Sequence, residues 1–163
     1  MRVYVPMTLP GLADWSKNGV AEPVSAHAVT PGVREWYTEG DLEELEYAVL
    51  LDAARASLDL LEYDFDAPRR RVVVAVDVPD AAVGAPAYDA PSRSAVVVQV
   101  PLGADAIVSV HVDEESAVAT VEAAVEALPA ARLGDEDAAF ALDEAEACDL
   151  LWYDASEVEG LIG

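Results

Sequence analysis

The sequence predicts an α+β fold of α/β-like character, with a mixed sheet of about five strands and helices mainly on one face. Short runs rich in β-branched residues alternate along the chain with segments whose apolar residues recur at helical spacing. Four of these runs are each followed by a cap or turn and then a helical pattern, which indicates helices laid on a sheet. The middle runs have no long helix between them, which favours antiparallel pairing. A distant ferredoxin-like topology is one arrangement consistent with this order.

Capping and turn residues set the expected boundaries. Two threonines are typical helix N-caps with proline in the first turn. Thr8 precedes a segment of helical periodicity that ends at Gly19, and Thr30 directly precedes Pro31. Asp41 with Glu44 three residues later predicts a capping box at the start of the longest helix. We expect strands at residues 2–7, 69–78, 95–100, 107–112 and 150–153, and helices at residues 9–18, 31–40, 41–65, 114–128, 135–147 and 156–162.

Length and composition predict one folded domain, residues 1–163. A chain of 163 residues with 53% hydrophobic residues can bury a substantial core, and disordered chains are far less apolar. Asp113 is expected to cap the helix that Pro129 stops. Residues 20–29 are expected to form loop or irregular extended chain.

Charge limits the classes of partner. The sequence has 32 Asp and Glu residues against 9 Lys and Arg, a formal net charge of −23. Such a field repels phosphate groups, so nucleic acid and anionic membranes are not expected as partners. Solubility is the simplest role for the acidity, and an acidic face that mimics nucleic acid is the third and weakest hypothesis for function.

Cysteine content and the first residues predict a cytoplasmic protein. The one cysteine, Cys148, forms no intramolecular disulfide framework and is expected to be a reduced thiol. The first residues, Met1 to Pro6, predict a strand and show no signal-peptide pattern. No apolar run is long enough to cross a membrane.

The densest group of polar and aromatic residues lies between Ser25 and Tyr47, across a loop and two helix starts. Its candidate binding residues are His27, Arg34, Trp36, Tyr37, Glu43, Glu46 and Tyr47. They offer an acid or base, an anion clamp and a carboxylate pair one helical turn apart. The competing interpretation is structural: acids favoured by a helix N-terminus, aromatics that anchor a short helix, and an arginine in a local ion pair.

Other chemistries lack a supporting pattern. Ser109, His111 and Asp113 share one face of a strand, but a catalytic triad is assembled from distant segments. No spacing typical of a metal site or of a phosphate-binding loop occurs, so we expect no metal, no cofactor and no catalytic residue that can be named. The basic run at residues 69–71 is expected to guard a Val-rich strand against aggregation.

The chain nevertheless resembles a known family. The similarity lies in residues 1–9, 27–48, 69–75 and 111–113, and in the motif Leu150-Leu151-Trp152-Tyr153. These stretches are similar to an uncharacterised family of high-GC actinobacterial proteins, catalogued as a domain of unknown function. The resemblance covers nearly the full length and implies a bacterial cytosolic protein, without implying an activity.

Two classes of function therefore stay open. The absence of any nucleophile, metal or phosphate motif favours a non-enzymatic binding or regulatory domain, with an unknown protein partner or small molecule and a homodimer among the expected assemblies. Trp36, Tyr37, Trp152 and Tyr153 are its expected partner surface, because aromatic residues are enriched at interfaces. The alternative is a small-molecule enzyme, which requires His27, Arg34 and the Glu43 and Glu46 pair to meet in one pocket.

Overall fold

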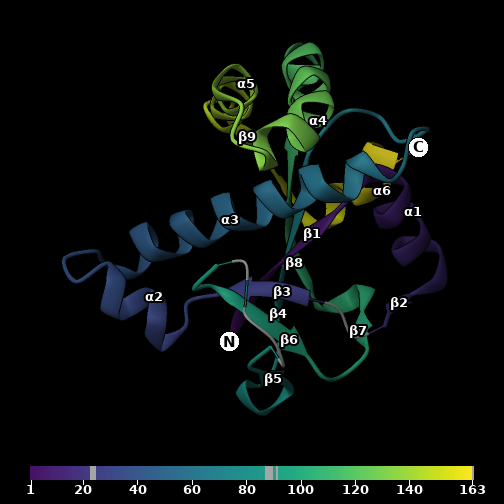
Figure 1. Cartoon of the computed structure of the whole chain (residues 1–163). Helices are drawn as coiled ribbons and strands as arrows, with labels where there is room; N and C mark the ends of the chain where they lie inside the picture. The colour runs from purple at the N-terminus through teal and green to yellow at the C-terminus, as the bar shows by residue number, and fades with distance from the viewer. Residues whose placement is uncertain (23–24, 87–89, 91, 163) are drawn as a thin grey trace.

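A β-sheet is the middle layer of the protein (Figure 1). The computed structural model describes residues 1–22, 25–86, 90 and 92–162, and within them seven strands pair in the order β5-β6-β3-β1-β4-β8-β9, each antiparallel to its neighbours. The strands are β1 (Arg2–Met7), β3 (Ser25–Ala28), β4 (Val72–Asp77), β5 (Val83–Gly84), β6 (Ala95–Val98), β8 (Ile107–Asp113) and β9 (Leu150–Asp154). A separate two-stranded ribbon joins β2 (Val20–Ala21) to β7 (Leu102–Gly103).

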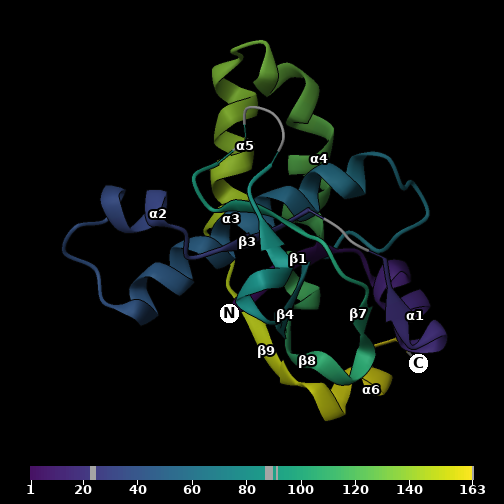
Figure 2. The ribbon, with the colours of Figure 1, turned by 90° about the horizontal axis from the view of Figure 1, so that it is seen from below.

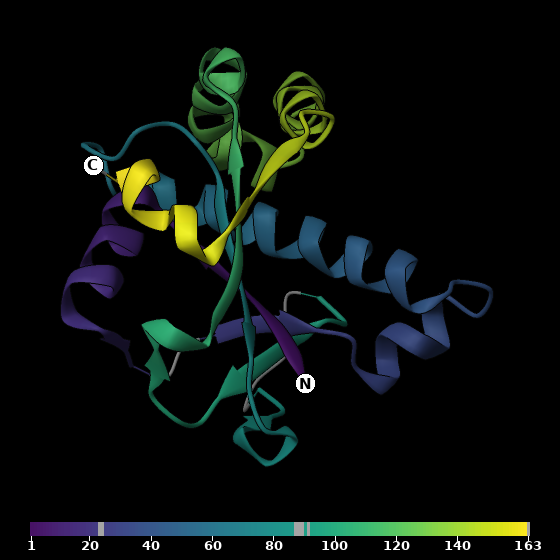
Figure 3. The same cartoon turned by 180° about the vertical axis from the view of Figure 1, so that it is seen from behind.

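Helices cover both faces of this sheet. The helices are α1 (Leu9–Asn18), α2 (Pro31–Trp36), α3 (Leu42–Glu62), α4 (Val118–Arg132), α5 (Glu136–Glu146) and α6 (Val158–Ile162), with short 3₁₀ turns at Asp80–Ala82, Ala104–Ala106, Glu115–Ala117 and Ala155–Glu157. Figures 1 and 2 show α3 crossing one face, with α2 at its N-terminal end and the α4–α5 pair beside its C-terminal half. The helices α1 and α6 lie together on the opposite face (Figure 3).

Alternation along the central strands explains the two faces of the core. Val3 and Val5 of β1 point to the side that Leu12 and Trp15 of α1 cover, whereas Tyr4 points to the side of α3. The α3 side contains Val49, Ala53, Val73 and Ala75, and a second cluster joins α3 to α4 and α5 through Leu58, Leu61, Val121, Leu128 and Leu142. Different helices thus cover the two faces of the sheet, α1 and α6 on one and α3 with α4 and α5 on the other.

Local signals placed several elements correctly. The expected bounds of the first strand and the first helix are confirmed, and the Thr8 hydroxyl accepts a hydrogen bond from Gly11 N at 3.1 Å. Gly19 ends that helix at φ 78°, a left-handed conformation that glycine adopts without strain. Asp41 caps α3 by accepting from Glu44 N at 2.9 Å, but the return bond from the Glu44 side chain that would complete the predicted capping box is absent from the described bonds. Side chain–backbone capping is readable in sequence because both partners lie within four residues.

The sheet differs from the expectation in size, pairing and coverage. The coarse prediction of an α+β fold is confirmed, but the sheet has seven described strands in place of about five, and it is antiparallel in place of mixed. Helices α1 and α6 occupy the face that was expected to be mainly open. The strand β3 was expected to be loop, because its small residues carry no β-branched run. Pairing with β1 and β6 on either side makes it a strand.

One part of the ferredoxin-like expectation is present. Strands β3 and β4 both run antiparallel to β1, so they run parallel to each other with β1 between them, and α3 connects them. This is a split β-α-β unit. The strand that fills the gap precedes both of its neighbours in the chain. The strand on the other side of β3 is β6, which follows β4 in the chain, whereas a ferredoxin-like fold places there a strand that comes before β3, so the complete ferredoxin-like connectivity is not followed.

Several further boundaries were also wrong, and two of them show why. Helix α2 ends at Trp36, four residues before the expected Gly40. Helix α4 continues through Pro129 to Arg132, whose guanidinium contacts Asp59 Oδ1 at 3.0 Å and Glu62 Oε2 at 2.8 Å on α3. These contacts with the neighbouring helix stabilise a last turn that proline alone would disfavour.

Arg71 and Asp113 form a buried ion pair. The sequence had predicted different roles for them, a surface gatekeeper for Arg71 and a helix cap for Asp113. Arg71 is 1% exposed and binds Asp113 through two side-chain hydrogen bonds, Nε to Oδ2 at 2.8 Å and Nη2 to Oδ1 at 2.7 Å. Arg71 Nη2 also donates to Cys148 O at 2.9 Å. Asp113 thus does not cap the helix that follows, and Arg71 is not a surface gatekeeper. The pair joins the start of β4 to the end of β8.

Candidate functional site

The candidate residues between Ser25 and Tyr47 are positioned by β3, α2 and the first turns of α3. Thr30 fixes the start of α2 twice: its hydroxyl accepts from Val33 N at 3.1 Å and donates to Arg93 O at 2.6 Å. The second bond ties α2 to the loop before β6. Arg34 of this helix lines one cavity, and Trp36 lines another.

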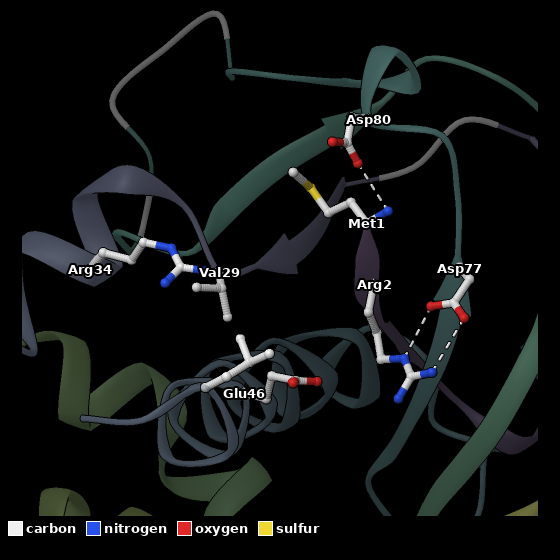
Figure 4. A pocket seen from close by; sticks show the side chains of 8 residues that line it. Met1, Arg2, Val29, Arg34, Glu46, Asp77 and Asp80 are labelled. Carbon is white, nitrogen blue, oxygen red and sulfur yellow. Dashed lines mark hydrogen bonds and ion pairs between the residues drawn. The ribbon is translucent and has the colours of Figure 1, made fainter.

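The first of these is a cavity of about 380 Å³, which we call the Arg34–Glu46 cavity. Figure 4 shows Arg34 and Glu46 reaching toward it from different elements, with Arg2 and Asp77 on a third side. Its described lining residues come from β1, β4, α2, α3 and the loops between them: Met1, Arg2, Val29, Arg34, Leu42, Glu46, Asp77 and Asp80. Segments that are distant in sequence therefore share one charged hollow.

Most charged groups of this cavity already have partners. Arg2 donates to Asp77 through two nitrogens, at 3.1 and 3.2 Å, and the Met1 nitrogen contacts Asp80 Oδ1 at 3.0 Å (Figure 4). Arg34 is different, because its guanidinium forms no hydrogen bond or ion pair with any described residue. An arginine left unpaired beside a cavity, in a chain with 32 acidic residues, is available to an anionic group from outside.

Glu46 is held in place by the sheet. The Tyr4 hydroxyl donates to Glu46 Oε2 at 2.8 Å. Burial raises the pKa of Tyr4 above its usual value, and this hydrogen bond to the carboxylate raises it further. The phenol therefore remains a donor at neutral and alkaline pH. The other oxygen, Oε1, has no partner among the described residues and is left to accept from a ligand.

The second cavity, of about 220 Å³, lies between α2, α3 and the loop before β6. Its described lining is Val33, Trp36, Tyr37, Ala48, Val49, Asp52, Ser92 and Arg93. The Arg93 guanidinium stacks on the Trp36 ring, 3.7 Å from its centroid, so the chain supplies its own cation to this aromatic face.

Behind this second cavity lies a buried polar network. Ser94 Oγ donates to Asp52 Oδ2 at 2.6 Å and lies 2.9 Å from His27 Nδ1 and 3.0 Å from Ser92 Oγ. The hydroxyl has a single proton, and the carboxylate can only accept. Ser94 Oγ therefore accepts from His27 Nδ1–H and from Ser92, which assigns the Nδ1–H tautomer to the neutral ring.

This arrangement does not activate a serine. A nucleophilic serine gives its proton to a histidine that carries a lone pair toward it. In this network the His27 nitrogen that faces the two serines is the protonated one. Burial lowers the pKa of His27 below its ordinary value of 6.5, and Asp52 opposes that shift. His27 thus serves as a neutral donor that links β3 to the start of β6.

The structure divides the predicted residues among several places. Arg34 and Glu46 meet in one cavity, while Trp36 and Tyr37 line the other. The remaining candidates do not join them: His27 is 5% exposed inside the network, and Glu43 and Tyr47 lie exposed on α3. The predicted segment is therefore not one convergent site.

Sequence reasoning missed residues on which both cavities depend. Tyr4, Arg2 and Asp77 lie in the strands predicted at residues 2–7 and 69–78, where no candidate site residue was named, and Asp52 lies within the apolar stripe of the longest helix. A polar residue inside a core-facing stripe was the available signal for Asp52. Among the described residues, no group of three or more His, Cys, Asp or Glu side chains is placed to hold a metal ion.

Comparison with known proteins gives a family without an activity. The family model described as "Family of unknown function (DUF6912)" matches residues 1–162. The chain belongs to this family. No curated protein and no solved structure matches the chain. Within the described part of the chain, no helix is both long enough and apolar enough to cross a membrane.

Proposed function

We propose that this member of the DUF6912 family is a small-molecule-binding domain whose Arg34–Glu46 cavity holds a small zwitterion, such as a free amino acid. One observation supports this most directly. Arg34 and Glu46 line the same cavity with opposite charges, yet they form no ion pair with each other. A ligand that carries both charges would bridge this gap.

Each end of such a ligand has a matching group. A ligand carboxylate would accept two hydrogen bonds from the planar Arg34 guanidinium, a geometry that lysine does not offer. A ligand ammonium would donate to Glu46 Oε1, because Tyr4 occupies Oε2. The cavity volume of about 380 Å³ lies within the usual range for small-ligand sites.

Other hollows suit this ligand less well. A hollow of about 450 Å³ beside Pro31 and Ala95 is larger, but no carboxylate occurs among its described lining residues. The cavity beside Asp52 has its aromatic face occupied by Arg93. We therefore place the zwitterion in the Arg34–Glu46 cavity in preference to either of these two hollows.

Several observations favour binding or regulation over catalysis. The described lining of the Arg34–Glu46 cavity contains no His, Cys, Ser or Thr. His27, which the enzyme alternative requires, is committed to Ser94. We place this binding domain in the bacterial cytosol, in keeping with the actinobacterial resemblance. Of the four aromatic residues expected as a partner surface, Trp36 and Tyr37 are exposed near the cavity, and we propose that they form a partner surface together with the exposed Tyr47 of α3.

Ligand-dependent thermal stability tests the proposal. We expect at least one standard amino acid to raise the melting temperature of the wild-type protein. At ten times its Kd, a ligand stabilises the folded state by about 1.4 kcal/mol, or about 3–6 °C for a protein of this size. The Arg34→Gln variant is expected to lose this shift.

The matched control is Arg55→Gln. Arg55 is a half-buried arginine that lies in α3 and contacts Glu146 Oε1 at 3.5 Å, outside the cavity. This variant is expected to keep the full ligand shift. If no amino acid stabilises the wild type, or if Arg34→Gln retains the shift, the proposed function is wrong.

A further inference from the structure

Strand β9 forms an unprotected edge of the sheet. It pairs with β8 on one side and is the last strand in the sheet order (Figure 3). Its side chains include Trp152, which is 60% exposed, and Leu151, which is 39% exposed. Natural edges are commonly blocked by lysine, proline or a bulge, and β9 contains none of these.

The hydrogen-bonding pattern shows which main-chain groups of β9 are open. Asp113 N donates to Arg71 O at 3.1 Å, so Asp113 directs its main-chain groups toward β4. Alternate residues of an antiparallel strand point to opposite sides, so Val112 directs its groups toward its partner Leu151 in β9. The N–H and C=O of the next residue, Trp152, must then point away from the sheet.

The neighbouring bonds agree with this assignment. Asp154 has the same parity as Trp152, and its outward N–H is taken by Glu157 Oε2 at 2.8 Å. The main-chain N–H and C=O of Trp152 have no partner among the described residues. The centre of the edge is therefore free to pair with another extended segment, whereas its C-terminal end is closed by a side chain.

Charge around this edge indicates the chemistry of the partner. Residues 133–163 contain no Lys or Arg. They carry these exposed acids: Asp135, Glu136, Asp137, Asp143, Glu144, Glu146, Asp149, Asp154, Glu157 and Glu159. Of these acids, Glu146 pairs with Arg55, and no other contacts a basic group in the described residues. Asp149 lies directly before β9 and Asp154 is its last residue, so a segment that pairs with β9 passes an exposed carboxylate at each end of the strand.

We propose that the β9 edge binds an extended, Lys- and Arg-rich segment of a partner protein by strand addition. The partner backbone pairs with the N–H and C=O of Trp152, which supplies affinity without dependence on sequence. Its basic side chains contact the surrounding carboxylates, and an arginine can stack on the exposed Trp152 ring. Apolar side chains of the segment pack beside Leu151.

Charge favours this occupant over a second copy of the chain. Two copies paired through β9 would bring together two acidic surfaces, each from a chain of net charge −23. A basic segment removes that repulsion and gains attraction instead. This surface is separate from the Arg34–Glu46 cavity and does not depend on the function proposed for it.

Binding of a short peptide that alternates lysine with valine tests the proposal by fluorescence anisotropy. We expect the peptide to bind the wild-type protein, and a glutamate–valine peptide not to bind. Raising the salt concentration is expected to weaken binding, because the surface charges are screened. Loss of the outward hydrogen bond in Trp152→Pro should weaken binding about fivefold relative to Trp152→Val, which keeps the N–H.

Two controls distinguish specific binding at the β9 edge from nonspecific binding of the peptide. Phe65→Val removes an exposed aromatic residue in the turn after α3, outside the sheet and both cavities, and is expected to bind the peptide like the wild type. If Trp152→Pro does not fold, hydrogen exchange of the wild-type Trp152 amide gives the same information, since the peptide should slow it. Equal binding by Trp152→Pro and Trp152→Val, an unprotected Trp152 amide, or a wild-type dimer that Trp152→Pro dissociates would overturn the proposal.

Discussion

Removal of the Asp113 carboxylate is the sharpest test of the interior. Asp113 is fully buried, and its carboxylate accepts from Arg71 N at 2.7 Å, Arg71 Nε at 2.8 Å and Arg71 Nη2 at 2.7 Å. An Asp113→Ala variant therefore leaves a buried guanidinium without its counter-charge and a main-chain donor without an acceptor. Breaking a buried pair in this way costs about 3–5 kcal/mol.

The loss is large enough to measure by two methods. At about 2–4 °C per kcal/mol for a chain of this size, the melting temperature should fall by about 6–20 °C. Urea denaturation followed by circular dichroism should give a lower midpoint with an unchanged slope. Asp149→Asn, which changes an exposed carboxylate in the turn before β9, should alter the free energy of unfolding by less than about 0.5 kcal/mol.

A double-mutant cycle identifies the cause. Arg71→Met alone leaves Asp113 buried and unpaired, so it should destabilise as much as Asp113→Ala. The double variant removes both charges and should be less destabilised than the sum of the two single changes, by at least about 2 kcal/mol. Additive effects, or an Asp113→Ala loss under about 1 kcal/mol, would refute the argument that the pair is desolvated and mutually dependent.

Two further predictions concern His27 in the buried polar network and Trp15 of α1 on the opposite face of the sheet. Because burial lowers the pKa of His27 below 6.5, the stability contributed by its neutral ring is complete above that pH and is lost as the pH falls toward the native pKa. In His27→Gln, the fall in the free energy of unfolding between about pH 7.5 and 5.5 should therefore be smaller than in the wild type; an equal fall would contradict the assignment. Trp15→Phe removes a buried hydrogen bond, from Nε1 to Leu102 O at 2.9 Å, and leaves a cavity, so it should cost about 2–4 kcal/mol in urea denaturation. A loss near zero would show that Leu102 finds another donor.

The elements that the sequence predicted correctly are those whose signals are local. Thr8, Thr30, Asp41 and Asp135 each cap a helix through a main-chain nitrogen three residues away. By contrast, β3 depends on β1 and β6, which lie far away in the sequence. Its small side chains have no periodicity that would identify them as a strand. Local chemistry therefore predicted helix starts better than it predicted the sheet.

For the same reason, the sequence predicted only some of the neighbours of the candidate residues. Arg34 and Glu46 lie in one short segment, so their proximity followed from the sequence, and a shared cavity contains both. The partner that holds Glu46 is Tyr4, 42 residues away, and the partner of His27 is Ser94, 67 residues away. Sheet pairing brings these residues together. Grouping candidates by closeness in sequence placed His27 in the wrong cluster.

The sequence alone determined the acidity, the starts of α1, α2, α3 and α5, the Val-rich strands and the α+β class. These depend on composition and on contacts within one turn of chain. Only the tertiary structure decided which charged side chains are buried in ion pairs and which are not. Arg71 forms a buried ion pair with Asp113, whereas Arg34 lines a cavity. The tertiary structure also made β9 the edge of the sheet and turned Trp152 outward. Burial and strand order arise from contacts between distant segments, and one sequence carries no local signal for them.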